Sequence, residues 1–467
     1  MKLKLNLIIM MFGFTASYAQ FHTLNIPQPS PHVNDIFSSF EKELLNELSN
    51  GGAPGIQVSI MYNGEVYNKS FGYSNFNKKI KANNKTLFKN ASTGKVFVAY
   101  AAIKLSLLGK LDLDKNISTY ISGLNSEIGK LTTRQLITHT SGLKDESDNF
   151  GPSGLSQQIK MAKTLGSDKF FGESGMVFSY SNANYDLAGA VIESLTGWDF
   201  NTAMMKLVFE PLNMKATTYR FDVANPKNVA FGHSGSGPNY STNTTIPDNA
   251  RGRASGMALT TAEELNKFLM WLQIDHKDQF DNKLKDAVLE VFSNKKMTGA
   301  YWEYGYGLFH STYCNTNAIW HSGGMPGYKA AFLSVPEQSF SVTVLANGSG
   351  INQWNVIKKA VETVINGNCS LISNNVELTD ISEEEGQELI GTYTQGIGAR
   401  IKVFKKEDTF VMSVDGGPSY ELKKRGEDNI VTIRENKPST SYGVFKDKNG
   451  KVLYLQYWVR AYPKVNM

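Results

Sequence analysis

The chain has little cysteine: only Cys314 and Cys369 occur among its 467 residues. At most one disulfide can therefore form, and the two thiols pair only if their Cα atoms lie close together, which the sequence leaves open. Stability must come from burial of apolar side chains. A chain of this length can bury a large core and form two or three domains.

Clusters of basic residues are also lacking. The formal net charge is +5, with basic residues scattered among acidic ones, a distribution that disfavours nucleic acid as a partner. No group of residues has the spacing of metal ligands, and there is no internal repeat. We therefore expect no metal and no cofactor.

No apolar run reaches the roughly 20 residues that span a bilayer, so we expect no stable membrane insertion. The amino terminus carries Lys2 and Lys4, a short apolar stretch, and small residues at the cleavage-determining positions of Ser17-Tyr18-Ala19 before Gln20. This pattern predicts that residues 1–19 are a signal peptide and that the protein is periplasmic or extracellular. An uncleaved anchor is disfavoured because the apolar stretch is short, and the lack of a cysteine after the cleavage site disfavours a lipoprotein.

Alternating apolar residues predict two pairs of strands with a mainly helical region between them. The first pair is joined by Asn63-Gly64, the strongest short hairpin signal, and the second is followed by a predicted helix at Trp354–Val364. The strands are predicted at Gly55–Tyr62 with Glu65–Tyr67 and at Ala331–Val335 with Phe340–Leu345, and the helical periodicity covers Leu131–Leu272. The expected class is α+β, with an antiparallel sheet flanked by helices plus a helical region.

A change in composition divides the chain near its carboxyl end. Residues 370–387 are polar and acidic and are predicted as a linker. They separate a main domain, residues 20–369, from short alternating segments in residues 388–467 with turn signals at Asp415–Pro418 and Asn449-Gly450. These segments predict a small antiparallel β-sheet or barrel, for which the sequence suggests no site of its own.

One of four Ser-x-x-Lys patterns stands in a suggestive context. The patterns occur at Ser39/Lys42, Ser92/Lys95, Ser141/Lys144 and Ser293/Lys296. Only Ser92/Lys95 opens a long uncharged run, Val96–Ile103, which is typical of a helix covered on all sides. On a helix, residues three apart share one face, so the hydroxyl and the amine can come within hydrogen-bonding reach. Burial and the positive end of the helix dipole both favour the neutral amine, which could accept the serine proton.

Three further patterns accompany this pair. Tyr180-Ser181-Asn182 lies at the entry of a predicted helix, where the tyrosine could transfer protons if positive neighbours lower its pKa and Asn182 could hold a substrate amide. His321-Ser322-Gly323-Gly324 precedes the second strand pair, and its glycines would let backbone N–H groups approach an oxyanion. Each also has an ordinary structural reading, as a core tyrosine with a capping asparagine and as a strand edge with a turn. The third is Thr138–Leu143, in which His139 is read as structural.

Taken in order, these motifs resemble the penicillin-recognising serine hydrolases, a family that includes class C β-lactamases, D-alanyl-D-alanine carboxypeptidases, D-aminopeptidases and related esterases. The resemblance extends over roughly residues 40–366 and also includes Gly109–Asp114 and Pro211–Met214. It implies a β-lactamase/transpeptidase-like domain and an acyl-enzyme on Ser92, with Lys95 and Tyr180 sharing proton transfer. It further implies an oxyanion site at the N–H groups of Ser92 and Gly324, with Asn182, His321 and Gly323 lining the substrate site.

The chain departs from the family at His321, where the commonest motif has lysine. A histidine is mostly neutral near pH 7 and anchors a carboxylate less firmly. This departure disfavours an efficient β-lactamase or strict carboxypeptidase and favours an esterase, amidase or D-aminopeptidase acting on a small-molecule or peptide-like substrate. Arg251 and Arg253 could supply the missing charge, although solvated surface arginines are the favoured reading. The rival is a binding or sensing protein, in which acylation is slow or absent and the site captures a ligand without turnover. The sequence does not specify the oligomeric state.

Overall fold

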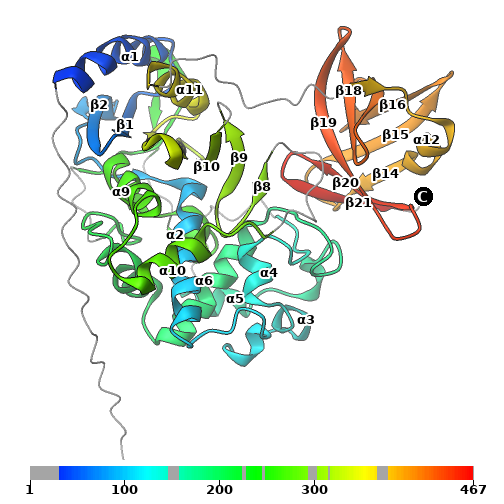
Figure 1. Cartoon of the computed structure of the whole chain (residues 1–467), viewed down its shortest axis with the longest axis horizontal. Coiled ribbons are helices and arrows are strands. Elements are labelled where there is room, and N and C mark those ends of the chain that lie inside the picture. Colours follow the sequence, from blue (N-terminus) through cyan, green and yellow to red (C-terminus); the bar gives the residue numbers. More distant parts are fainter. Residues whose placement is uncertain are drawn as a thin grey trace, which may run out of the picture.

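The computed structural model describes residues 31–145, 157–222, 228–243, 248–292, 302–313, 316–364 and 377–465. The predicted signal peptide and both cysteines lie outside the described residues. Two bodies lie side by side: a larger α+β domain and a smaller carboxy-terminal domain (Figure 1). Within the described part of the chain, no helix has the length and apolar character needed to cross a bilayer.

The first predicted hairpin is confirmed. Strands β1 (Gly55–Tyr62) and β2 (Glu65–Asn75) pair antiparallel, with Tyr62 opposite Glu65. The turn residues Asn63 and Gly64 have φ of 49° and 82°. Two consecutive positive φ values are the requirement of a two-residue turn whose twist matches that of the strands, and asparagine and glycine tolerate them best.

The sheet of the larger domain has eight strands in the order β3-β2-β1-β12-β11-β10-β9-β8, and the neighbouring strands pair antiparallel. The predicted second strand pair forms β11 and β12, at the centre of the sheet. The remaining strands are β3 (Ile80–Lys81), β8 (Glu303–Tyr304), β9 (Phe309–Tyr313), β10 (Thr316–Met325), β11 (Tyr328–Val335) and β12 (Phe340–Ala346). The antiparallel sheet that the sequence predicted is therefore confirmed.

Both faces of this sheet are covered. On β12, Val342 and Val344 belong to a core shared with α1 (Pro31–Ser49) and α11 (Gln353–Val364), whereas Leu345 belongs to the core of the helical region. Successive side chains of a strand point to opposite faces, so a strand covered on both sides is apolar at nearly every position.

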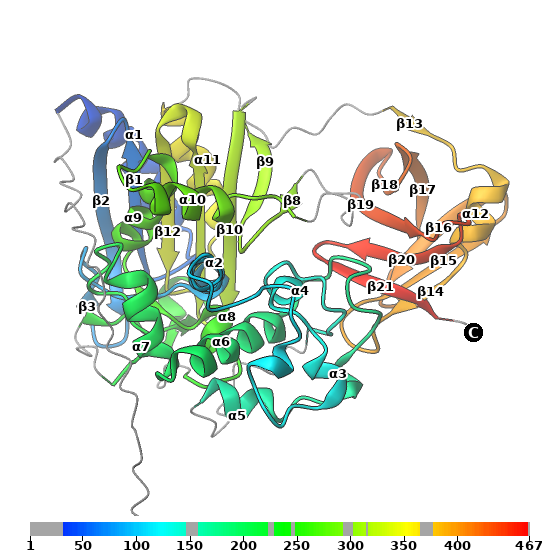
Figure 2. The ribbon, with the colours of Figure 1, turned by 60° about the horizontal axis from the view of Figure 1, so that its bottom comes forward.

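The helical region lies on one side of the sheet, with α2 (Lys95–Leu107) at its centre (Figures 1 and 2). Every residue from Lys95 to Ile103 is buried, which explains the lack of charge in the run after the lysine. The surrounding helices are α3 (Ser126–Gly129), α4 (Thr133–Ile137), α5 (Gln158–Ala162), α6 (Asn182–Thr196), α7 (Phe200–Met204), α8 (Arg253–Gly256), α9 (Ala262–Gln273) and α10 (Gln279–Val288). Two further strand pairs complete the domain. They are β4 (Phe88–Lys89) with β7 (Leu259–Thr260), and β5 (His233–Ser234) with β6 (Ser241–Thr242).

The smaller domain is an antiparallel barrel, closed by pairing of β17 with β18. Its strands are β14 (Gly391–Thr394), β15 (Arg400–Lys406), β16 (Thr409–Val414), β17 (Tyr420–Arg425), β18 (Asn429–Arg434), β19 (Lys437–Lys446), β20 (Val452–Tyr457) and β21 (Arg460–Val465), with β13 (Leu378–Thr379) added beside β17. Closure leaves no free edges in the barrel itself.

Part of the segment predicted as a linker is helical. Helix α12 (Glu383–Leu389) begins with a capping box in which Ser382 and Glu385 bond each other's backbone N–H groups. Glu383, Glu384 and Glu385 stand in the first turn, where the helix dipole favours negative charge, and Leu389 packs into the barrel core. The polar composition of residues 370–387 thus reflects a capped helix as well as a connection between the two domains.

Candidate active site

Ser92 lies in a 3₁₀ turn, Ala91–Gly94, that leads directly into α2. Ala91 has φ of 46°, a left-handed conformation that is uncommon for a residue with a side chain. The serine is half-buried whereas Lys95, one turn later, is fully buried. A hydroxyl that solvent can reach is therefore placed beside an amine that solvent cannot reach.

The Lys95 amine lies within hydrogen-bonding distance of three oxygens. Nζ is 3.1 Å from Ser92 Oγ, 2.7 Å from Asn182 Oδ1 and 2.7 Å from the carbonyl oxygen of Ser255. The last two are acceptors only. A neutral amine has two N–H groups for them and one lone pair left, which would face the serine hydroxyl.

Burial lowers the pKa of Lys95 from its ordinary value, and the negative charges of Asp186 and Asp145 oppose that shift. Asp186 is buried in α6 and accepts hydrogen bonds from the N–H of Gly252 and from the N–H and hydroxyl of Ser255. Burial raises the pKa of Asp186 above its ordinary value, while the charge of Lys95 and these hydrogen bonds oppose that rise. The bonds also fix the carbonyl that accepts from Lys95.

Tyr180 precedes α6, and interaction with the Ser92 side chain acts to lower the pKa of its phenol. Its ring lies 4.8 Å from Lys95 Nζ and packs on the His139 ring, with centroids 4.2 Å apart. The sequence reading required positive neighbours to lower the pKa of Tyr180. In the structure burial dominates and raises that pKa well above its ordinary value, so the phenol is a proton donor rather than a resting phenolate.

Asn182 is the first residue of α6. Its side-chain oxygen accepts from Lys95, and its backbone N–H donates to Asp145 Oδ1 at 2.8 Å. The oxygen is therefore engaged within the site, which leaves the amide nitrogen as the group that could hold a substrate carbonyl.

Strand β10 brings Gly323 of the His321–Gly324 segment against Ser92. A Cβ added to Gly323 would lie 2.5 Å from the backbone nitrogen of Ser92 and 2.8 Å from the Ala91 Cβ, so only glycine permits this approach. Strand β9 pairs with residues 316–320 of β10. The segment that follows, His321 to Gly324, continues past this pairing toward Ser92.

His321 is buried, with Nδ1 2.6 Å from the carbonyl oxygen of Ser322. Burial lowers its pKa to about 3, and the nearby Lys95 acts in the same direction. The imidazole is therefore neutral at physiological pH and adds no positive charge to the site.

Neither of the two arginines considered from the sequence lies in this cluster. Arg251 donates to Thr164 Oγ1 at 3.3 Å, and Arg253 forms an ion pair with Asp248 at 2.9 Å. A different arginine, Arg460 of the barrel domain, approaches the site through an ion pair with Asp145.

The sequence reading did not single out Asp186, Asp145 or Arg460. His139 was read as structural, and it is buried with Nδ1 accepting from the N–H of Ser181 at 3.2 Å. Asp186 could have been found as a candidate site residue because it is an acidic residue within a mainly apolar predicted helix. Nothing in the sequence pairs Asp145 with a residue of another domain.

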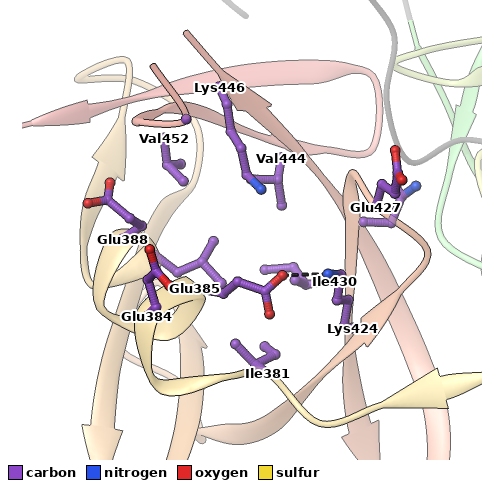
Figure 3. A pocket seen from close by; sticks show the side chains of 13 residues that line it. Ile381, Glu384, Glu385, Glu388, Lys424, Glu427, Ile430, Val444, Lys446 and Val452 are labelled. Atoms are coloured by element: carbon purple, nitrogen blue, oxygen red, sulfur yellow. Dashed lines mark hydrogen bonds and ion pairs between the residues drawn. The ribbon is translucent and has the colours of Figure 1, made fainter. Parts of the chain in front are cut away.

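A cavity of about 300 Å³ lies elsewhere, inside the barrel domain beside α12 (Figure 3). Its apolar lining includes Leu389, Ile430 and Val444, and Glu385 and Lys424, which also line it, form an ion pair. None of the residues around Ser92 lines it. Among the described residues, no group of three histidine, cysteine or acidic side chains is arranged to hold a metal ion.

A family model described as Beta-lactamase matches residues 36–360. Protein flp of Staphylococcus aureus (strain N315) is 26% identical over 328 residues, which are 68% of this chain and 64% of that protein. The match thus spans less than two thirds of that relative's length.

Solved structures share the fold. The crystal structure of SurE has a TM-score of 0.74 at 21% identity, covering 92% of this chain and 98% of that chain. A class C β-lactamase has a TM-score of 0.60 at 17% identity, covering 73% of this chain and all of that chain, 100%. Because the family model matches well over half of the sequence, and because the fold is that of its solved members, the chain belongs to the beta-lactamase family.

Proposed function

We propose that this protein is a serine hydrolase that forms an acyl-enzyme on Ser92 and acts on ester or amide, peptide-like substrates. Proteins of this fold are generally serine hydrolases. One observation carries the proposal: a fully buried lysine amine lies 3.1 Å from the hydroxyl of a half-buried serine. Burial favours the neutral amine, which is the form that can accept the serine proton.

The proton path follows from the hydrogen bonds. Lys95 takes the proton of Ser92 as its Oγ attacks the substrate carbonyl, and the resulting oxyanion is held by the backbone N–H groups of Ser92 and Gly324. Tyr180, kept protonated by burial and with its ring 4.8 Å from Lys95 Nζ, donates to the leaving group, and the Lys95 ammonium restores that proton. Water then hydrolyses the acyl-enzyme with the same groups acting in reverse.

The substrate class follows from charge. A neutral His321 at the strand edge holds a substrate carboxylate weakly, which favours an ester, amide or D-peptide bond over β-lactams or peptides read by their carboxyl terminus. One fold relative, SurE, has been crystallised with D-Leu, so substrates that contain D-residues belong in the assay.

The test is intact-mass spectrometry of the full chain and its Ser92→Ala variant after incubation with a fluorophosphonate, benzylpenicillin and p-nitrophenyl acetate. Turnover of p-nitrophenyl acetate, benzylpenicillin and D-alanine p-nitroanilide is followed in parallel. Ser49, an exposed serine at the end of α1, provides the control variant Ser49→Ala. We expect adducts and turnover in the parent and in Ser49→Ala, and neither in Ser92→Ala, which should fold normally.

The other outcomes separate the rivals. Efficient penicillin hydrolysis would make the protein a β-lactamase, and one equivalent of product followed by nothing would make it a sensor. Unchanged hydrolysis in Ser92→Ala would sink the assignment of the nucleophile. We also propose that the protein is exported, and we expect the amino-terminal residue of protein from the periplasm or medium to be Gln20.

A further inference from the structure

The turn between β20 and β21 of the barrel domain reaches toward the main domain (Figure 2) and contacts the backbone of Tyr180. The N–H of Tyr180 donates to the carbonyl oxygen of Val459 at 2.8 Å. Val459 also packs against the aromatic cluster that contains Phe178, Tyr180 and Phe309. The tyrosine of the site is therefore held by a residue from the other domain.

Ser179, the residue before that tyrosine, is held in the same way. Its hydroxyl oxygen lies 3.2 Å from the backbone nitrogen of Ala461 and 3.2 Å from Nε2 of Gln395, both in the barrel domain. Its own N–H donates to the carbonyl oxygen of His139 at 2.8 Å. The segment that leads into α6 is thus fixed between the two domains.

The third contact is ionic. Arg460 pairs with Asp145 Oδ2, and Oδ1 of the same carboxylate accepts from the N–H of Asn182 at 2.8 Å. The Asp145 side chain is only 4% exposed and that of Arg460 is 35% exposed. Removing one partner of a buried pair leaves an uncompensated charge. A chain of direct contacts therefore runs from Arg460 through Asp145 and Asn182 to the Lys95 amine.

The same two charges act on Lys95 through space. The negative charge of Asp145 favours the ammonium form, and the positive charge of Arg460 disfavours it. The other titratable groups around the amine come from the helical region and from β10. They are Asp186, Tyr180, Tyr185, His139 and His321.

We propose that Arg460 is a positioning residue for the site: by pairing with Asp145 it holds the Tyr180–Asn182 segment against Lys95 and Ser92, so that the barrel domain completes the active centre. This inference rests on the proposed function. The barrel is then part of the catalytic machinery rather than an appended stabilising module.

Removing the positive charge of Arg460 and removing the negative charge of Asp145 should shift the pKa of Lys95 in opposite directions. Arg460→Gln leaves the Asp145 carboxylate uncompensated, so the ammonium is favoured and the Lys95 titration moves to higher pH. Asp145→Asn removes the carboxylate while Arg460 remains, so the titration moves to lower pH. We expect shifts on the order of one pH unit. The double variant should lie between the two single variants, and Arg460→Lys should restore most of the parent behaviour.

The first measurement is the titration of Lys95 by ¹³C NMR in full-length protein labelled at lysine Cε, with the signal assigned by Lys95→Arg. It does not depend on catalysis. The second is the pH dependence of kcat/KM for p-nitrophenyl acetate. On the acid side of this profile, kcat/KM should rise as Lys95 loses its proton. The pH of that rise should move together with the midpoint of the NMR titration. Arg434→Gln removes an exposed arginine of the same domain that pairs with Glu435, and it should move neither.

Opposed shifts in the two single variants would support the proposal. Equal midpoints in all variants, or a change in KM with no change in the Lys95 titration, would overturn it, because Arg460 would then act elsewhere or on the substrate itself. Shifts of the same sign in both single variants would indicate simple disruption and would also overturn it. If the parent protein forms no Ser92 adduct, the proposed function fails while the NMR titration still decides this inference.

Discussion

At the scale of single residues, the site depends on close approach of backbone segments to Ser92 as much as on reactive side chains. Ser92 is positioned by neighbours that have no side chain: a Cβ on Gly256 would lie 2.8 Å from the carbonyl carbon of Ala91, and one on Gly323 would lie 2.5 Å from the nitrogen of Ser92. Two segments far apart in the chain thus enclose the turn that carries the serine. This explains how Ala91 keeps its left-handed conformation there.

Gly323→Ala should therefore impair acylation while the protein stays folded. The new methyl group would displace the Ser92 nitrogen, which is a proposed oxyanion donor, and loss of one such donor typically costs about 100- to 1,000-fold in rate. The measurement is the rate of fluorophosphonate labelling. Gly324→Ala is the matched control, because its Cβ would meet only the flexible Lys329 side chain at 3.4 Å, and it should cost much less. Equal losses would contradict the steric argument.

At the scale of elements, polar side chains inside the main domain join strands to the segments that surround the site. Gln57 on β1 is buried, and its Oε1 accepts from the N–H of Ala262, the first residue of α9, at 2.5 Å. Its Nε2 donates to the carbonyl oxygens of Asn83 at 3.0 Å and Thr86 at 3.2 Å. One side chain thus connects the sheet, a helix start and a loop, which is why a glutamine occupies this buried position of the strand.

We predict that Gln57→Leu destabilises the main domain by about 2 to 4 kcal/mol, because it leaves a helix N–H and two carbonyl groups without their partner. Urea unfolding followed by tryptophan fluorescence measures the loss. Gln338→Leu, at an exposed turn of the same domain, should change the free energy of unfolding by less than about 0.5 kcal/mol. A similar loss in both variants would show that the bonds of Gln57 contribute little.

At the scale of the whole molecule, the two domains have separate hydrophobic cores. The barrel core contains Leu422, Leu455 and their neighbours, and no member of it belongs to the two large cores of the main domain. The described contacts between domains include a few hydrogen bonds, one ion pair and the aromatic cluster around Val459. Such an interface permits separate unfolding of the domains.

Calorimetry should accordingly show two transitions. Leu455→Ala should lower the transition of the barrel, and Leu105→Ala, in the core around α2, should lower that of the main domain; each truncation costs about 2 to 5 kcal/mol. If the barrel completes the site, fluorophosphonate labelling of Leu455→Ala should fall at temperatures where only the barrel has unfolded. A single transition that both variants shift equally would show that the domains unfold as one unit.

The sequence by itself determined what depends on neighbours along the chain. The placement of Ser92 and Lys95 on one side of a helical turn follows from their spacing of three, and the first hairpin follows from Asn63-Gly64, because helix periodicity and turn geometry act over a few residues. The ordered motifs also indicated the family. Burial of Lys95 was foreseen because the run that follows is uncharged.

Only the tertiary structure decided which distant residues surround that pair. Asn182 reaches Lys95 across 87 residues, and Arg460 reaches Asp145 across 315. Such contacts depend on how helices, loops and domains pack, and no local pattern encodes them. The high pKa of Tyr180 has the same origin, because desolvation is a property of the packed surroundings and not of the tripeptide in which the tyrosine stands.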